Sequence, residues 1–150
     1  MFGTGERWLL CKTRSRCFAL PVGAALEIMR ALPTERVATA PPFVLGVSII
    51  RGIPVPVVDT AALLGEPMSD AKRFSTVRAR SRILAFAIES VIGLHTIPKA
   101  VQEKLPALFG NNDAIAAIAA LDEGITYFLN AARAVSEDFL AALDDLESGA

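Results

Sequence analysis

The sequence predicts a mainly β fold with two small lobes and one amphipathic helix at the C-terminus. Short runs rich in β-branched residues alternate with tight turn signals through most of the chain. These runs fall into two β-rich halves, which suggests two similar small barrels. From residue 136 onward, apolar side chains instead recur at helical spacing. A chain of 150 residues is long enough for one substantial core and too short for two ordinary independent domains.

The N-terminal segment predicts a β-hairpin. Residues 8–13 and 16–20 are largely apolar runs that flank the polar tip Arg14-Ser15. In such a hairpin Cys11 and Cys17 would lie across from each other, where a disulfide is sterically conceivable. We expect two buried thiols instead, because a reducing cytoplasm disfavours the bridge.

The next two predicted strands are residues 44–50 and 53–58, which are separated only by Arg51-Gly52. They form either two strands or one strand bent at the glycine. Pro54 and Pro56 lie in the second run, and proline cannot donate to a sheet ladder. We therefore expect that strand to have an unpaired edge or a bulge.

Residues 66–82 are polar and predict an exposed loop between the lobes. The loop carries five basic side chains, which are Lys72, Arg73, Arg78, Arg80 and Arg82. Strands resume at residues 83–88 and 91–96, joined by a tight connection. We expect residues 1–135 to form one two-lobed domain and residues 136–150 to form the terminal helix.

Near the C-terminus, a hairpin competes with a helix. Residues 114–121 are alanine-rich and favour a helix by propensity alone. The turn signal Asp122-Glu123-Gly124 and a strand-like run at 125–129 favour a hairpin, which we prefer. Ser136 is a suitable N-cap for the final helix. Its apolar positions are Phe139, Leu143 and Leu146.

Two segments have no decided state. Residues 24–29 fit a helical turn or the start of a strand, because periodicity cannot decide over so short a window. Residues 97–108 contain a helix-compatible piece between Pro98 and Pro106.

The composition narrows the function classes. A net charge of −1 provides no global field for nucleic acid or an anionic membrane. The hydrophobic content of 53% exceeds what one compact core needs, so some apolar surface should meet another protein. No run approaches a membrane span. Residues 1–7 lack the features of a signal peptide, so we expect a cytoplasmic protein.

Few residues suggest catalysis. His95 is the sole histidine, which excludes a histidine-rich metal site, and a half-buried strand position explains it better than chemistry does. Asp59 ends an apolar strand, where its carboxylate can accept backbone N–H bonds and start a turn. An acid-base catalyst using Asp59 and His95 is a weaker hypothesis, because it lacks a third group. We expect no enzyme activity, metal or cofactor.

Arg51 stands out because an arginine between two apolar strands needs a carboxylate partner if it is buried. Glu27 is a candidate for that partner. Such a pair could tie two elements together or bind another molecule, and the residues alone leave both roles open.

Residues 26–59 resemble the signature half of the CheW family. The matching pieces are Glu27-Ile28, Ala40-Pro41-Pro42-Phe43-Val44, Gly46-Val47, Arg51-Gly52, Pro56-Val57 and Asp59. The combination is far more specific than any single piece, and weaker likeness covers most of the remaining chain. The sequence departs from the pattern at Ile49, where the family usually has asparagine.

This resemblance implies two five-stranded SH3-like β-barrels packed together. It also implies a non-enzymatic adaptor that links chemoreceptors, the methyl-accepting chemotaxis proteins, to a CheA-type histidine kinase. A receptor-tip helix would lie in a groove between the lobes, and the kinase regulatory domain would dock edge to edge on one lobe. The receptor-binding residues that it implies are Ala25, Glu27, Gly46, Arg51 and Gly52.

An alternative function is nucleic-acid binding through the basic segment 72–82. Only Phe74 is available there for stacking on bases, and acids elsewhere balance the charge. We therefore expect neither nucleic-acid binding nor direct insertion into a membrane.

Overall fold

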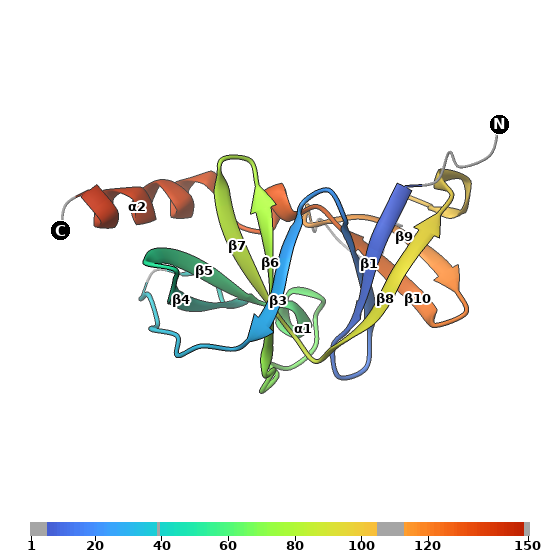
Figure 1. The fold of residues 1–150 in the computed structure, drawn as a ribbon, viewed down its shortest axis with the longest axis horizontal. Helices are drawn as coiled ribbons and strands as arrows, with labels where there is room; N and C mark the ends of the chain where they lie inside the picture. Colours follow the sequence, from blue (N-terminus) through green and yellow to red (C-terminus); the bar gives the residue numbers. More distant parts are fainter. Residues whose placement is uncertain (1–5, 39, 105–112, 149–150) are drawn as a thin grey trace.

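The computed structural model describes residues 6–38, 40–104 and 113–148, which form two packed five-stranded sheets and a C-terminal helix (Figure 1). The first sheet, here called the terminal lobe, has the order β8-β1-β2-β10-β9. The second, the central lobe, has the order β3-β6-β7-β5-β4. The predicted fold class is confirmed, because the protein is mainly β with two packed five-stranded sheets of SH3-like type and one C-terminal helix.

The terminal-lobe strands are β1 (Glu6–Lys12), β2 (Cys17–Pro21), β8 (Ser90–Ile97), β9 (Ile115–Leu121) and β10 (Gly124–Leu129). The central-lobe strands are β3 (Ala25–Arg30), β4 (Val44–Ile50), β5 (Ile53–Asp59), β6 (Arg73–Ala79) and β7 (Arg82–Ile88).

The lobes do not correspond to the two halves of the sequence, so the suggested division was wrong. The central lobe is inserted between β2 and β8, and β8 returns to pair with β1 in the terminal lobe. Only Glu89 separates β7 from β8, but the two strands cannot form a hairpin, because β6 and β5 already occupy both edges of β7. The crossover is anchored where Glu89 N donates to Lys12 O at 2.9 Å.

The two lobes have the same topology. In each sheet the successive pairings are antiparallel, antiparallel, parallel and antiparallel, with β8 equivalent to β3 and β10 equivalent to β5. A short helical turn follows the equivalent strand in both lobes, namely α1 (Thr60–Leu63) and the 3-10 turn η3 (Ala131–Arg133). Asp59 caps the first and Asn130 caps the second, each through a side-chain oxygen that accepts a backbone N–H.

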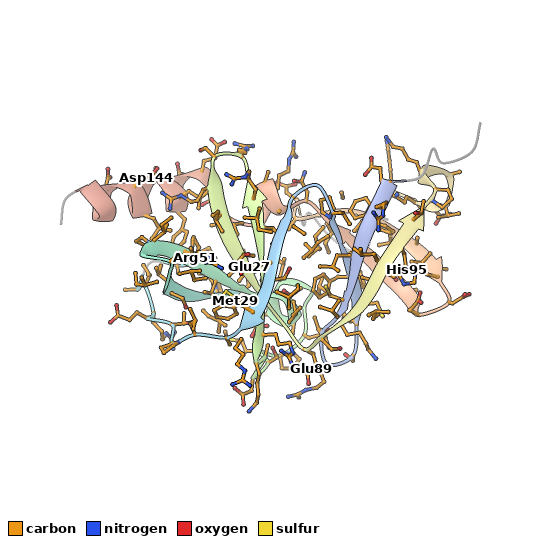
Figure 2. The ribbon with its side chains drawn as sticks, in the orientation of Figure 1. Glu27, Met29, Arg51, Glu89, His95 and Asp144 are labelled. Carbon is orange, nitrogen blue, oxygen red and sulfur yellow. The ribbon has the colours of Figure 1, made fainter. Side chains whose placement is uncertain are left out.

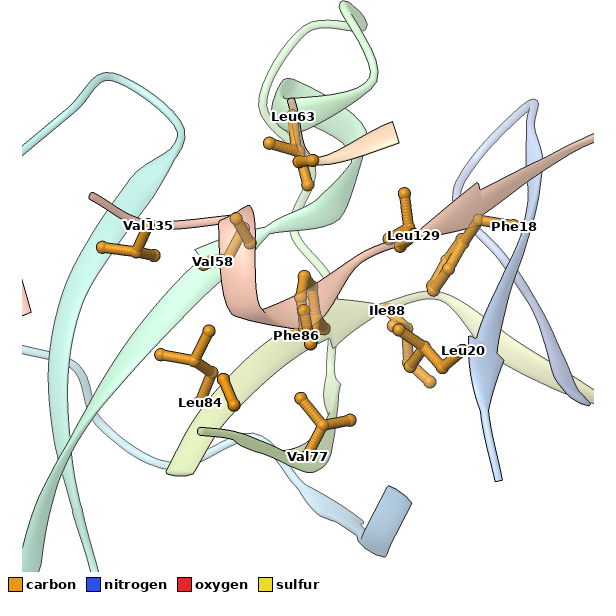
Figure 3. Close-up of a cluster of buried hydrophobic side chains, with 14 of the residues drawn as sticks. Phe18, Leu20, Val58, Leu63, Val77, Leu84, Phe86, Ile88, Leu129 and Val135 are labelled. Atoms are coloured by element: carbon orange, nitrogen blue, oxygen red, sulfur yellow. The ribbon is translucent and has the colours of Figure 1, made fainter. Parts of the chain in front are cut away.

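The described residues form three apolar clusters, which together bury much of both faces of each sheet. The largest, here called the shared core, joins the lobes (Figure 3). Its members include Leu9, Phe18 and Leu20 of the terminal lobe and Val58, Val77, Leu84, Phe86 and Ile88 of the central lobe. Each lobe also has its own interior, with Trp8, Leu10 and Phe128 in the terminal lobe and Val55, Val57 and Phe74 in the central lobe.

The expectation of an exposed loop over residues 66–82 was wrong for its second half. Strand β6 occupies 73–79, and Phe74 and Val77 are buried on opposite faces of it, in the central-lobe interior and the shared core. Arg73 and Arg78 occupy the two exposed positions of this strand, and every other residue of it is buried, so the charges do not mark a loop. Residues 66–72 contain no strand.

The structure also answers the remaining secondary-structure predictions. The undecided segment 24–29 falls largely in strand β3, which begins at Ala25, and the alanine-rich segment forms the preferred hairpin with β10. Helix α2 spans Glu137–Ser148, and its Phe139 N donates to Ser136 Oγ at 3.2 Å, so the N-cap is confirmed. Phe139 and Leu143 pack in the shared core; the side chain of Leu146 lies outside the described residues. Within 97–108, a 3-10 turn η1 spans Lys99–Val101, and 105–112 are outside the description.

The cysteines are free and buried, as expected, but they do not face each other. Cys11 pairs with Phe18, and Lys12 pairs with Cys17, so the register differs by one residue from the expected one. Side chains at successive positions point to opposite faces of a sheet. Burial raises the pKa of the Cys11 thiol to about 12, which makes this thiol unreactive at neutral pH.

Pro54 and Pro56 lie where the sheet has a free edge, as predicted. Strand β5 pairs with β4 from Ile53 to Val58, but its parallel pairing with β7 covers only Val57 to Asp59. Both prolines therefore precede the part of β5 that is hydrogen-bonded on two sides.

We expect Gly46→Ala to destabilise the fold by roughly 3 kcal/mol or more, because Gly46 has a φ of 143° and an added Cβ would lie 1.8 Å from Glu35 O. Gly23→Ala is the matched control, since an added Cβ there meets nothing within 4 Å. It should change stability by about 0.5 kcal/mol or less. Urea unfolding followed by the fluorescence of Trp8, the sole tryptophan, measures both. Equal stabilities of the two variants would contradict this role of Gly46.

Candidate functional site

The site begins at the turn between β4 and β5. Ile50 and Ile53 are paired, so Arg51 and Gly52 form a two-residue hairpin loop. Their φ angles are 52° and 78°, and positive φ at both central residues is the pattern of a type I′ turn. Glycine adopts this conformation freely, whereas Arg51 adopts it with strain. The turn thus fixes the direction in which the arginine leaves the sheet.

Glu27 of β3 faces this turn (Figure 2). Its backbone is held by Thr76 of β6, because Glu27 N donates to Thr76 Oγ1 at 3.2 Å and Thr76 Oγ1 donates to Glu27 O at 3.3 Å. Arg51 Nε donates to Glu27 Oε1 at 3.1 Å, and Arg51 Nη2 donates to Glu27 Oε2 at 2.9 Å. The pair is therefore bidentate, the geometry that best orients a guanidinium.

The ion pair links the two edge strands of the central-lobe sheet. Strands β3 and β4 are its edge strands, and Glu27 lies on the first while Arg51 directly follows the second. The hydrogen bonds of Arg51 lower the pKa of Glu27 and raise that of Arg51. The Arg51 side chain is 75% exposed and that of Glu27 35% exposed, so both charges remain available to a partner.

A pocket of about 360 Å³ opens beside the pair. Its lining is mostly apolar and comprises Leu26, Glu27, Ile50, Arg51, Ile53, Val55, Thr76 and Ile83. Leu26 and Ile53 of this lining are 46% and 47% exposed. Ile28 on β3 and Ile49 on β4, which are not part of the lining, are 41% and 62% exposed. Large aliphatic side chains this exposed on β3, β4 and β5 suggest a surface for another protein. We call the pocket and these four residues the β3/β4 surface.

Residues 7–139 match the CheW-like domain family. The chain belongs to this family. CheW-like domains serve as adaptors in chemotaxis signal transduction. The fold also matches the crystal structure of the scaffolding protein TtCheW from Thermoanaerobacter tengcongensis, with a TM-score of 0.72 and 16% identity, covering 83% of this chain and 88% of that one. No curated protein matches the sequence.

The structure brings together most of the residues that the CheW resemblance implies. Glu27, Arg51 and Gly52 meet at the pair, and Ala25 lies near them at the start of β3. Gly46 is buried and lies against the backbone at Glu35, where Glu35 and Val47 exchange hydrogen bonds of 2.8 and 2.9 Å. Its position explains a structural need for glycine. A receptor-facing role for these residues stays a prediction.

Sequence reasoning missed the exposed aliphatic residues of the β3/β4 surface. Along β4, Ser48 is buried while its neighbour Ile49 is 62% exposed, the reverse of the usual arrangement. Ser48 is satisfied, because its Oγ donates to Pro33 O at 2.9 Å. The available signal was the isoleucine at 49, where the CheW pattern has asparagine.

Asp59 and His95, the other two candidate residues, occupy positions that serve the fold. Asp59 is fully buried, with Oδ1 accepting from Ala62 N and Oδ2 accepting from Ser69 N. His95 is half-buried on β8 in the other lobe (Figure 2), so the two residues do not form one site. Among the described residues, no group of three or more His, Cys, Asp or Glu side chains could hold a metal ion.

The basic segment 72–82 forms strand β6 and the turn after it rather than a free cationic loop. Arg80 pairs with Glu137, and Arg82 pairs with Asp144, so helix α2 neutralises two of its five charges. This arrangement favours a solvated, partly paired surface over a phosphate-binding one. In the part of the chain described, no helix is long and apolar enough to cross a membrane.

We expect Arg51→Ala to lower the melting temperature slightly and Arg51→Gly to melt above Arg51→Ala. Both variants remove the exposed guanidinium, but only glycine relieves the positive φ. Thermal melts followed by circular dichroism compare them with the wild type. Arg51→Gly melting below Arg51→Ala would show that the turn places no strain on residue 51.

The pair should also have a pH signature. Because folding lowers the pKa of Glu27, its contribution to stability is present above the ordinary glutamate pKa and is lost as the pH falls through the lowered value. The difference in melting temperature between wild type and Glu27→Gln should therefore vanish in acid. Melts at a series of pH values test this, and a difference that grows in acid would contradict it.

Proposed function

We propose that this CheW-like protein is a non-enzymatic adaptor in the cytoplasm that couples chemoreceptors to a CheA-type histidine kinase. The observation that carries the proposal is the β3/β4 surface, an apolar pocket framed by a fixed, exposed ion pair. An amphipathic receptor helix would place apolar side chains against Leu26, Ile28 and Ile53. The guanidinium of Arg51, oriented by Glu27, would give that contact its specificity.

An adaptor needs a second surface, and the terminal lobe offers one. Strand β8 is an edge strand whose Val91, Ile92 and Leu94 are 36%, 36% and 53% exposed. A kinase regulatory domain docked along this edge would leave the β3/β4 surface free. The adaptor would then act by effective concentration, since a kinase held beside its receptor meets it as if within one molecule.

The proposal predicts a ternary complex. Size-exclusion chromatography of the protein with a receptor cytoplasmic hairpin and a kinase regulatory domain from the same cell should yield one species that contains all three. Competition between the two partners, or the absence of binding to either, would contradict the adaptor role.

The binding site itself is tested with Arg51→Gly, which removes the guanidinium and keeps the turn. We expect this variant to bind the receptor hairpin about tenfold or more weakly, as the loss of an arginine anchor commonly does. Arg14→Gly is the matched control, because Arg14 is an exposed arginine in the β1–β2 turn of the other lobe. Isothermal titration gives both affinities. Wild-type affinity of Arg51→Gly would remove Arg51 from the receptor site.

A further inference from the structure

Two glutamates occupy equivalent positions in the two lobes. Glu66 is the seventh residue after the cap Asp59, and Glu137 is the seventh after the cap Asn130. Between cap and glutamate, both segments contribute apolar side chains to the shared core, Leu63 and Leu64 in one case and Ala134 and Val135 in the other. The topological repeat therefore extends beyond the strands.

Each glutamate reaches a hairpin turn of the opposite lobe. Glu66 follows β5 of the central lobe, yet it accepts hydrogen bonds from Thr13 and Ser15 in the β1–β2 turn of the terminal lobe. Glu137 follows β10 of the terminal lobe and pairs with Arg80 in the β6–β7 turn of the central lobe. The two contacts are thus reciprocal under the internal symmetry.

The Glu66 contact is the more enclosed of the two. Its side chain is 9% exposed, and Thr13 Oγ1 donates to Oε1 at 2.5 Å. Burial raises the pKa of Glu66, but the hydrogen bonds from Ser15 and Thr13 and the charge of Arg16 outweigh this effect and lower it. The carboxylate is therefore ionised at neutral pH.

Arg16 of the terminal lobe also lies close to the Glu66 carboxylate. Its Nη1 donates to Tyr127 Oη at 2.5 Å, which holds the guanidinium against β10 of its own lobe. Its buried Nε has no hydrogen-bond partner and lies 3.9 Å from Glu66 Oε1. A movement of the lobes by about 1 Å would bring that pair to hydrogen-bond distance. In the present arrangement the charge of Arg16 acts on Glu66 without a hydrogen bond between them.

The shared core alone fixes the distance between the lobes better than their angle. Apolar attraction is non-directional and depends on area, so small rotations cost little of it. Hydrogen bonds lose strength steeply when their angles change. Polar contacts at the two ends of the interface are therefore the groups best able to select one angle.

We propose that Glu66 and Glu137 form a symmetric pair of interlobe latches that fix the angle between the lobes. Glu66 is the dominant latch because it is enclosed. Glu137 is the weaker one, since its side chain is 72% exposed and that of Arg80 is 55% exposed, which leaves their pair open to screening by salt. The further consequence that the angle tunes partner affinity rests on the proposed function, whereas the latch itself does not.

The latch is tested by distance measurements across the lobes. Spin labels at Arg78→Cys in the central lobe and Asp122→Cys in the terminal lobe occupy exposed positions, while native Cys11 and Cys17 are buried. Pulsed electron resonance should give one narrow distance distribution in the otherwise unchanged protein. We expect Glu66→Ala to broaden it clearly, Glu66→Gln to broaden it less, and Glu137→Gln to broaden it only in low salt or together with Glu66→Gln.

Two controls separate the latch from general loss of structure. Glu27→Gln breaks an ion pair within the central lobe and should leave the distribution unchanged. The fluorescence of Trp8, which packs edge-on against Phe128 at 4.8 Å inside the terminal lobe, should stay the same in every variant. A wild-type distribution in folded Glu66→Ala overturns the proposal. If Glu66→Ala fails to fold, Glu66→Gln decides, because it keeps a side chain of the same size.

Receptor binding provides the second readout. If the angle matters, Glu66→Ala should bind the receptor hairpin about threefold more weakly, as expected when the binding-competent fraction falls to about one third. A broadened distribution with unchanged affinity would overturn the link to binding and leave the latch standing. Wild-type affinity in Arg51→Gly together with a broadened Glu66→Ala distribution would refute the proposed site and support the latch.

Discussion

The fold depends on the apolar core that the two lobes share. Phe18 and Leu20 on one sheet meet Val77, Leu84 and Phe86 on the other, so neither lobe can be exposed to water without uncovering large side chains. Each sheet also has its own interior on the opposite face. This double burial accounts for much of the 53% hydrophobic content, because the described residues alone fill three apolar clusters.

The shared core also stabilises a terminal lobe whose strands come from both ends of the chain. The terminal lobe consists of β1 and β2 from the start of the chain and β8 to β10 from its end, and the whole central lobe lies between them. Such a lobe cannot form until distant strands have met, which carries a loop-closure cost. The central lobe is contiguous in sequence, and its face offers the apolar template against which the terminal strands can assemble.

The features that depend on neighbouring residues and simple charge pairing could be predicted from the sequence. Arg51 needed a carboxylate and a turn, and Glu27 and Gly52 supplied them. Other features depended on partners that the local sequence does not reveal. Position 46 requires glycine because the backbone of Glu35 leaves no room for a Cβ. Cys11 pairs with Phe18 rather than with Cys17. Residues 73–79 form strand β6 because Phe74 and Val77 pack in two different apolar clusters. The exposure of Ile49 also follows from a distant partner, because the neighbouring Ser48 is buried with its hydroxyl bound to Pro33 O; the sequence signal for it was the departure from the CheW pattern at residue 49.

Glu27 and Glu66 illustrate how one side chain type serves two purposes in the same protein. Glu66 is enclosed by hydroxyl donors from the other lobe, so its hydrogen bonds are largely used within the fold. Glu27 holds an arginine that is 75% exposed, and that guanidinium keeps donors directed at solvent. An adaptor requires both arrangements, because a fixed scaffold lowers the entropy lost on binding and an exposed, oriented donor supplies specificity. The positive φ of Arg51 belongs to the second arrangement, since a glycine there would fold more easily and present no charge.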